Sequence, residues 1–498
     1  MENLVYLQHL TGLIFTYYFS CYSFIAFSLV TSSITSNSTQ SAGATDTIVN
    51  RLHPQSRTLS EWLMYLESLH PKTIEMGLGR VERVRAELGL LPSFPVITVA
   101  GTNGKGSTCA MMEAILSRAG YRTGCYTSPH LLRYNERVRI AQREAGDQEL
   151  CKAFEAVEAA RTNCGVSLTY FEFGTLAAVQ LFSLAEVEIA ILEVGLGGRL
   201  DAVNIFDADC AVVTSIDFDH MDYLGDTREK IGLEKAGIFR SGKTAICTEP
   251  DLPTSVRQYA SEIGAKFLHL GEHFGYSIGE AGWSYWSQQG KRHSLPYPAL
   301  RGAYQLHNAS ACLAAIDAVK DNLPVTIGNI RQGLLEVNWP ARFQVLPGRP
   351  VTVLDVAHNP AAARALAENL GRMGRFNKTY AVFAMLRDKD IAGVLQAVGD
   401  QIDVWLVAGI SAARGASSDE IMQILQAAKL GRRSGRGPER GPSSDPSAGE
   451  ETIRAFPDPA AAYRYACERA AGNDRICVFG SFHTVAEVLQ YRNTVERA

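Results

Sequence analysis

Residues 95–108 read PVITVAGTNGKGST, and this stretch decides the fold. Its first six residues form the apolar run typical of a parallel strand that is covered on both faces. A loop with three glycines and Lys105 follows, and the apolar residues after it recur at helical spacing: Met111, Met112, Ile115 and Leu116. Glycine N–H groups, a lysine charge and the positive end of a helix all attract polyphosphate. The order strand, glycine loop, helix therefore predicts a phosphate-binding site.

The loop differs from the common GxxxxGK[ST] pattern. Val99 stands where that pattern has its first glycine, and Gly106 separates Lys105 from Ser107. An ordinary kinase or GTPase loop therefore fits poorly. We still expect a bound ligand rather than an empty glycine turn, because the lysine and the hydroxyls of Ser107 and Thr108 stand at the helix start, where a phosphate or a metal could meet them.

Similar strand-like runs follow this stretch along the chain. Four of them belong to the first part of the chain and four to the part after about residue 340: 95–100, 187–194, 210–216, 244–247, 351–356, 379–385, 404–407 and 475–480. Helical patterns alternate with them, and the first helix is expected to pack through one face that carries Leu59, Trp62, Leu63, Leu66 and Leu69. This pattern predicts an α/β fold. A P-loop-type ATPase domain with a mainly parallel sheet, residues 51–338, is followed by a smaller Rossmann-like α/β domain, residues 339–498.

Two segments are not expected to contribute to either core. Residues 1–50 are an apolar and Ser/Thr-rich extension that we expect to be disordered or non-native. Its run Leu13–Val30 could be read as a membrane anchor, but it has the minimum length for a span and no flanking Lys or Arg, so we do not expect membrane attachment. Residues 430–450 are rich in Gly, Pro, Ser and charge, which predicts a flexible insertion.

Composition excludes several classes of protein. The chain has 498 residues and a formal net charge of -4, which argues against a protein-wide nucleic-acid interface. Its ten cysteines form no CxxC pair, so we expect neither disulfides nor a structural zinc, and a reducing compartment, the cytoplasm.

Glu193 is the first candidate metal ligand. It ends a buried strand-like run and precedes a glycine-rich stretch near the predicted phosphate loop, which is the placement of a magnesium-binding carboxylate. The alternative is a salt bridge to Arg199. His220, taken alone, is more typical of a structural hydrogen-bonding histidine, since Mg²⁺ prefers oxygen ligands.

These motifs together resemble a known family. The loop TVAGTNGKGST, with the later blocks TSPH (127–130), DFDHMD (217–222), EKAGI (234–238), WPARF (339–343) and DVAHNP (355–360), is similar to the Mur ligase superfamily. Within it, the resemblance is to the folylpolyglutamate synthase/dihydrofolate synthase family, over about residues 58–488. It implies an ATP-dependent ligase that adds L-glutamate to dihydropteroate and to folates through an acyl phosphate. Residues 58–95 are too short for the sugar-nucleotide domain of the peptidoglycan members.

The resemblance also implies roles for individual residues. Catalytic roles fall on Lys105, Lys235 and His358, with Lys235 carrying a carbamate. ATP contacts fall on Asn103, Gly104, Lys105, Gly106, Ser107, Asn308, Arg342 and Asp355. Two Mg²⁺ ions are expected, one of them held by Ser128, Glu193 and His220. Substrate contacts fall on Glu75, Met76, Gly77, Leu78, Thr169, Tyr170, Phe171, Glu172, Leu200, Asp201, Ala202, His358 and Ser481.

Some residues depart from the family pattern or have a simpler interpretation. Tyr304 stands where histidine is more common, and Val356 replaces the glycine of DGAHNP. Tyr170 and Phe171 offer flat faces to a pterin ring, but such aromatic pairs more often pack in a core.

Three alternatives to a folate ligase stay open at this point. A different Mur-type amide ligase would take another acceptor. A nucleotide-dependent regulatory ATPase would release phosphate without an acceptor, and a membrane-anchored transporter ATPase would depend on Leu13–Val30. We expect a monomer whose ligands are ATP, dihydropteroate or folate, and L-glutamate, with no nucleic-acid partner.

Overall fold

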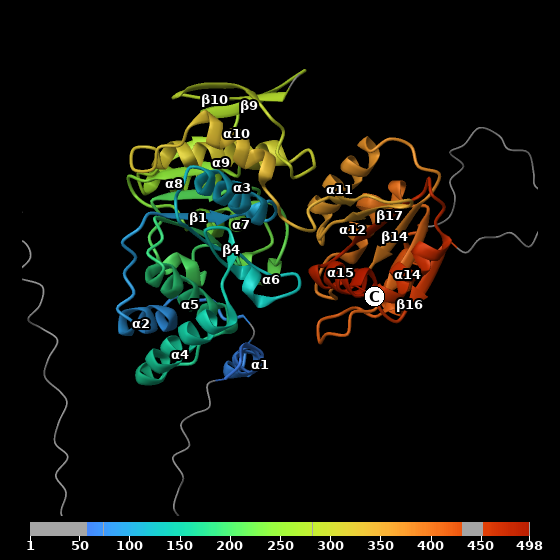
Figure 1. Cartoon of the computed structure of the whole chain (residues 1–498), viewed down its shortest axis with the longest axis horizontal. Coiled ribbons are helices and arrows are strands. Elements are labelled where there is room, and N and C mark those ends of the chain that lie inside the picture. The colour runs from blue at the N-terminus through green and yellow to red at the C-terminus, as the bar shows by residue number, and fades with distance from the viewer. Residues whose placement is uncertain (1–56, 73, 281, 431–451, 498) are drawn as a thin grey trace, which may run out of the picture. The chain divides into compact units, whose positions relative to one another are not determined.

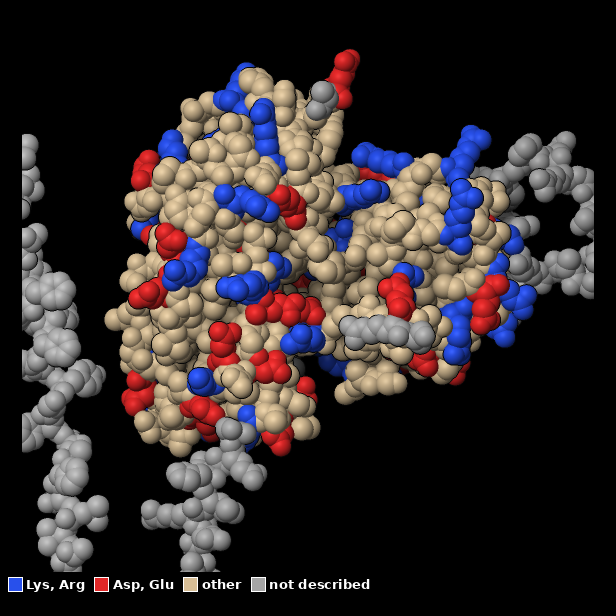
Figure 2. All heavy atoms as spheres, viewed as in Figure 1, with Lys and Arg blue, Asp and Glu red and all other residues tan. Residues whose placement is uncertain are grey.

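The computed structural model of the protein describes residues 57–430 and 452–497, apart from residues 73 and 281. The extension predicted at residues 1–50 lies outside these residues, and so does the insertion predicted at 430–450 except for Leu430. Residues 56–498 group into one unit, so the domain boundary predicted at 338/339 stays a prediction. Basic and acidic side chains are interspersed over the face shown in Figure 2.

The first sheet is built around the strand that precedes the glycine loop. It has the order β4-β3-β2-β5-β1-β6-β7-β8, in which β3 and β4 form an antiparallel edge and the other strands are parallel. Its strands are β1 (Val96–Ala100), β2 (Thr123–Tyr126), β3 (Val138–Ile140), β4 (Arg143–Glu144), β5 (Ile189–Glu193), β6 (Cys210–Val213), β7 (Thr244–Cys247) and β8 (Lys266–His269). Every residue of β1 and β5 is buried, as expected for parallel strands covered on both faces.

Helices cover both faces of this sheet (Figure 1). One face packs against α1 (Leu59–Leu69), α2 (Gly79–Glu87), α4 (Asp147–Cys164), α5 (Tyr170–Leu184), α7 (Arg228–Ala236) and α8 (Thr254–Glu262). The other packs against α3 (Lys105–Arg118), α9 (Gln305–Val319) and α10 (Ile327–Glu336). A capping box between Thr58 and Glu61 starts α1; of the five residues predicted on its packed face, Leu59, Trp62 and Leu66 are buried, and Leu63 and Leu69 are partly buried. The short helices η1 (Tyr134–Arg137), η2 (Ala202–Ile205) and α6 (Met221–Leu224) lie in connections.

A small antiparallel sheet was not predicted. It consists of β9 (Phe274–Gly279), β10 (Gly282–Ser287) and β11 (Gly290–Leu295) in the order β11-β10-β9. Trp283 and Tyr285 of β10 are buried in the same cluster as α3, α9 and α10, which anchors this sheet to the helices (Figure 1).

The second large sheet has the order β12-β13-β17-β14-β15-β16, parallel except at the edge strand β12. Its strands are β12 (Gln344–Leu346), β13 (Val351–Leu354), β14 (Thr379–Phe383), β15 (Val404–Ala408), β16 (Ile453–Phe456) and β17 (Arg475–Phe479). One face packs against α11 (Pro360–Arg372), α12 (Ile391–Val398) and α13 (Ser418–Ala427), the other against α14 (Pro459–Arg469) and α15 (Phe482–Arg497); η3 (Gly399–Gln401) follows α12. The predicted α/β class, with a large mainly parallel sheet followed by a smaller α/β part, is confirmed.

Two further expectations concern the described residues only. Nine of the cysteines lie in this part of the chain, and all nine are free thiols. Within the same ranges, no helix has both the length and the apolar character of a membrane span, and the run Leu13–Val30 lies outside them.

Candidate active site

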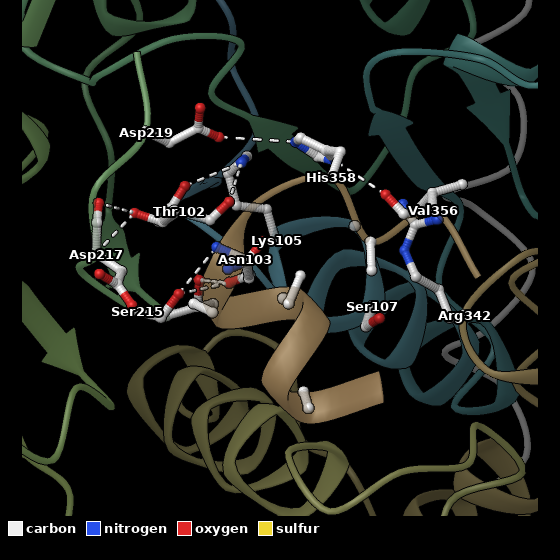
Figure 3. Close-up of a pocket in the computed structure, with 18 of the residues that line it drawn as sticks. Thr102, Asn103, Lys105, Ser107, Ser215, Asp217, Asp219, Arg342, Val356 and His358 are labelled. Carbon is white, nitrogen blue, oxygen red and sulfur yellow. Dashed lines mark hydrogen bonds and ion pairs between the residues drawn. The ribbon is translucent and has the colours of Figure 1, made fainter. Parts of the chain in front are cut away.

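A cavity of about 990 Å³ lies where loops from the carboxyl ends of both large sheets meet. This is where ligands bind to open parallel sheets. Figure 3 shows Lys105, Asp219, Arg342 and His358 around it. Fourteen predicted site residues line it: Asn103, Gly104, Lys105, Gly106, Ser107, Ser128, Glu193, His220, Lys235, Asn308, Arg342, Asp355, His358 and Ser481.

The glycine loop is shaped by close contacts that exclude side chains. Gly101 and Gly104 have φ angles of 148° and 88°, and a Cβ added to Gly104 would lie 2.5 Å from Oδ1 of Asn308. Lys105 opens α3, and its Nζ donates to the carbonyl oxygens of Gly101 at 2.9 Å and Thr102 at 3.3 Å. A phosphate would offer this ammonium a charged acceptor in place of two neutral ones, which makes a stronger hydrogen bond.

Glu193 stands at the end of β5, inside the cavity. Its Oε2 accepts a hydrogen bond from the backbone N–H of Ser128 at 3.0 Å, and the residue is 5% exposed. Burial raises the pKa of Glu193, while the charges of Lys105 and Arg342 act in the opposite direction. A buried carboxylate whose ionised form is costly is suited to a cation.

The alternative salt bridge between Glu193 and Arg199 is not what the structure contains. The guanidinium of Arg199 pairs instead with Oε1 of Glu234 at 2.8 Å. The salt-bridge interpretation of Glu193 is therefore wrong, and Glu193 lines the cavity together with Ser128.

His220 adopts a left-handed conformation, with φ of 52°, directly before α6. Burial lowers the pKa of His220 to about 4, so the imidazole is neutral near pH 7 and can act as a ligand. Its Nε2 lies 3.0 Å from Nζ of Lys389, which donates to it. No group of three or more His, Cys, Asp or Glu side chains at metal-ligand spacing occurs among the described residues, and the predicted set contains one carboxylate, one imidazole and one serine. The donor types fit a divalent ion that also takes phosphate oxygens.

Sequence reasoning missed a cluster of polar contacts around Asp219. The carboxylate of Asp219 pairs with Lys389, lies 3.7 Å from Nε2 of His358 and accepts from Nδ2 of Asn359 at 3.4 Å. Asn359 also exchanges amide hydrogen bonds with Asn103 of the glycine loop, at 3.2 and 3.1 Å. Burial alone would raise the pKa of Asp219, but the adjacent imidazoles of His358 and His220 and the ammonium of Lys389 hold it well below its usual range. The sequence signal for Asp219 and Asn359 was adjacency, since they lie within the blocks 217–222 and 355–360.

The loop around Asp355 follows β13 of the second sheet and lines the same cavity as the glycine loop of the first sheet. Asp355 accepts from the backbone N–H groups of Phe343 and Ala357, both at 2.8 Å, and the charge of Arg342 acts on its carboxylate. His358 donates from Nδ1 to the carbonyl oxygen of Val356 at 2.8 Å, which leaves Nε2 directed at Asp219 (Figure 3). Val356 is absent from the described residues with positive φ, so the turn accepts its β-branched side chain in place of glycine.

Lys235 is a buried lysine that also lines the cavity. Its residue is 3% exposed on α7. Burial, together with the charge of Lys105, lowers the pKa of Lys235 to about 7. A lysine with so low a pKa is largely neutral above pH 7 and can act as a nucleophile.

Several residues predicted to contact the pterin make structural contacts behind the cavity: a helix cap, an ion pair and ring packing. Thr169 and Glu172 form the capping box of α5, and Glu172 pairs with Arg80 at 2.9 Å. The ring of Phe171 lies 5.8 Å from that of Tyr126, the arrangement of a packing pair. None of the following residues, all of them described, lines the cavity: Glu75, Met76, Gly77, Leu78, Thr169, Tyr170, Phe171, Glu172, Leu200, Asp201 and Ala202.

These residues nevertheless support one wall of the cavity. Asp201 accepts from the backbone N–H of Leu196 at 2.8 Å, and a Cβ added to Gly195 would lie 2.6 Å from the ring of Phe171. Gly195 and Leu196 line the cavity. Direct pterin contact by this set stays a prediction.

Comparison with known proteins agrees with the geometry. The Mur ligase middle domain matches residues 99–316, and the glutamate ligase domain of Mur ligases matches residues 341–482. The dihydrofolate synthase/folylpolyglutamate synthase of Escherichia coli is 43% identical over 89% of this chain and 97% of its own length. The Haemophilus influenzae protein of the same name is 40% identical, over 86% and 96%.

Solved structures match over the same region. Escherichia coli FolC in complex with DHPP and ADP has a TM-score of 0.80 and 42% identity, covering 89% of this chain and 99% of its own. A bifunctional folylpolyglutamate synthase/dihydrofolate synthase with Mn, AMPPNP and L-glutamate bound has a TM-score of 0.78 and 44% identity, covering 88% and 98%. The chain therefore belongs to the dihydrofolate synthase/folylpolyglutamate synthase family, whose two domains are those of the Mur ligases.

Proposed function

We propose that the protein is an ATP-dependent ligase that joins the amine of L-glutamate to the carboxyl group of dihydropteroate, and likewise to the terminal carboxyl group of folates. The observation that supports this most strongly is the single cavity, which places the glycine loop, Glu193, His358 and Ser481 around one space. The relatives crystallised with DHPP and ADP, and with AMPPNP and L-glutamate, carry the corresponding ligands.

The reaction proceeds in two steps. A carboxylate oxygen of the acceptor attacks the γ-phosphorus of ATP, the bond to ADP breaks, and an acyl phosphate forms. The amine of glutamate then attacks the acyl carbon, and the tetrahedral intermediate expels inorganic phosphate. Lys105 and Arg342 stabilise the charge on the transferring oxygens, and His358 and Ser481 orient glutamate. Closure of the second sheet's loops over the cavity keeps water from the acyl phosphate.

Divalent metal completes this site. Ser128, Glu193 and His220 would hold one Mg²⁺, and Lys235, as a carbamate, would offer an oxygen ligand to a second. Such ions would supply positive charge that offsets the phosphate charge during transfer. We further propose that the enzyme acts as a cytoplasmic monomer.

The carbamate of Lys235 predicts a dependence on bicarbonate. Only a neutral amine reacts with CO₂, and the pKa of Lys235 is about 7, so the neutral fraction grows as the pH rises through 7. In CO₂-depleted buffer at pH 8 we expect activity to fall about 100-fold and to recover with added bicarbonate; recovery should be poor at pH 6. Lys235→Arg, which stays protonated and cannot form a carbamate, should show low activity without recovery. The steady-state rate of ADP release measures both.

Lys230→Arg is the matched control for this experiment. Lys230 lies on the same helix, pairs with Asp226 at the surface and lies outside the cavity. It should keep both full activity and the bicarbonate response. A wild-type enzyme that is fully active without CO₂ and shows no added carbon dioxide in its intact mass would contradict the carbamate.

Assays that leave out L-glutamate or the acceptor test which substrates the enzyme uses. ADP formation should require both L-glutamate and an acceptor, and dihydropteroate and tetrahydrofolate should each support it, with a glutamylated product identified by mass. Equal ADP formation with neither substrate would point instead to a regulatory ATPase. ADP formation with glutamate but with neither acceptor active would point to another amide ligase of the same superfamily.

A further inference from the structure

Trp339 lies in the connector between α10 and β12, residues 337–343, and its ring lies against the glycine loop. A Cβ added to Gly106 would lie 2.9 Å from Nε1 of Trp339 and 3.7 Å from Nη2 of Arg342. Gly106 is also the residue that separates Lys105 from Ser107 in the loop. The absence of a side chain there thus lets the connector approach the phosphate-binding loop directly.

Arg139 of β3 supports the other side of this ring. Its guanidinium carbon lies 5.5 Å from the centroid of Trp339, within cation–π range, and its Nη2 lies 3.3 Å from Oε2 of Glu113. Glu113 is 1% exposed and lies on α3, the helix that Lys105 opens. The charge pair therefore ties the connector to the helix of the glycine loop.

The ion pair between Arg139 and Glu113 is not expected to stabilise the folded state strongly by itself. Within the described residues, Nε of Arg139 and Oε1 of Glu113 have no hydrogen-bond partner. Burial raises the pKa of Glu113 to about 7, against the opposing charge of Arg139. Buried ion pairs that are incompletely hydrogen-bonded seldom repay their desolvation, and apolar residues often replace them without loss of stability. A positional role accounts for the arrangement better.

The rest of the connector is held in an unusual path. Ala341 and Phe343 have φ angles of 59° and 46°, values that cost about 1–3 kcal/mol for residues other than glycine unless the surroundings impose them. The backbone N–H of Phe343 donates to Asp355 at 2.8 Å, and that of Ala341 to Oε1 of Gln344 at 3.0 Å. Arg342 stands between these two residues and reaches the cavity (Figure 3). The direction of the Arg342 side chain is therefore fixed by the backbone contacts of the residues on either side of it.

We propose that Arg139 is a positioning residue for nucleotide binding: paired with Glu113, it holds Trp339 over Gly106 and so sets the path of the connector that carries Arg342 to the phosphates. Arg139 itself does not line the cavity. The proposal rests on the proposed function only in that the cavity binds ATP.

The test compares Arg139→Met, which keeps length without charge, with Arg139→Lys and Trp339→Leu. Calorimetry gives the Kd for a non-hydrolysable ATP analogue, and kinetics give the KM values and kcat. We expect Arg139→Met to raise both the Kd and the KM for ATP about tenfold, within the range by which residues acting through others change coupling. The KM for glutamate should stay unchanged, Arg139→Lys should recover most of the affinity, and Trp339→Leu should weaken nucleotide binding similarly. The double variant Arg139→Met/Trp339→Leu should bind the ATP analogue no more weakly than the weaker-binding of the two single variants.

Arg118→Met is the matched control. Arg118 lies on α3, the helix of Glu113, and pairs with Glu336 at the surface. It lies outside the cavity, so its loss should leave nucleotide binding unchanged. If Arg139→Met lowers the thermal midpoint but leaves the Kd and KM for ATP at wild-type values, the pair is structural only and the proposal is wrong. Should that variant not fold, Trp339→Leu decides by the same criterion. An enzyme that binds the analogue but forms no product would contradict the proposed function while leaving this comparison intact.

Discussion

Glu193→Ala is expected to lower kcat about 1,000-fold or more while the protein stays folded. The carboxylate is 5% exposed, stands at the end of β5 and shares the cavity with Lys105 and Ser128. Its loss removes the charged ligand of the proposed metal site and with it much of the charge stabilisation during phosphoryl transfer. Because burial raises the pKa of Glu193, the ionised side chain does not favour the folded state without a cation. We therefore expect the free energy of unfolding to change by only about 1 kcal/mol.

Two measurements accompany this variant. Binding of Mn²⁺ in the presence of ADP, followed by electron paramagnetic resonance, should weaken strongly, and thermal unfolding should stay close to wild type. Glu188→Ala is the control, because Glu188 lies just before the same strand, is exposed and bonds the backbone of Arg122 away from the cavity. Wild-type turnover in Glu193→Ala would remove the metal argument, and loss of folding in it would show that the carboxylate is structural.

Lys105→Met should lower kcat/KM for ATP about 100-fold to 1,000-fold. Among the residues that the structure describes, the ammonium donates only to the carbonyl oxygens of Gly101 and Thr102, both part of its own loop. Methionine keeps the length of the side chain and removes its charge, so the loss reports on the interaction with phosphate rather than on packing. Most of the loss should fall on kcat, because charge on the transferring oxygens changes most in the transition state.

A lysine on the protein surface controls for the loss of one charge. Lys152→Met on α4 removes an exposed ammonium outside the cavity and should leave both kinetic constants unchanged. If Lys105→Met changed neither kcat nor the KM for ATP, the glycine loop would not be the phosphate site. If only the KM rose, Lys105 would bind the nucleotide equally well in the ground state and the transition state.

The first sheet and its phosphate loop were predictable because their signals are local. Strand, glycine loop and helix are contiguous over residues 95–116, and the strands predicted at 187–194 and 210–216 are β5 and β6, the two neighbours of β1. Parallel neighbours bring their carboxyl ends to one edge, which is why Glu193 could be placed beside the loop before the structure was known.

The contacts between distant loops could not be predicted in this way. Lys389 and His220 are 169 residues apart, and no period or spacing in a single sequence reports which loop residues meet. The small sheet β9–β11 was missed for a different reason: its strands carry many glycines and serines, which weaken the alternating pattern of a half-buried strand. The pterin residues were inferred from resemblance alone, and the structure assigns several of them to caps and packing.

The central claim is that ATP activates the acceptor carboxyl group as an acyl phosphate within this cavity. It is tested most directly with dihydropteroate whose carboxylate carries a heavy oxygen isotope. After one turnover with ATP and L-glutamate, mass analysis of the released inorganic phosphate should find one labelled oxygen per molecule of product. Unlabelled phosphate, or label in a nucleoside monophosphate, would contradict the account.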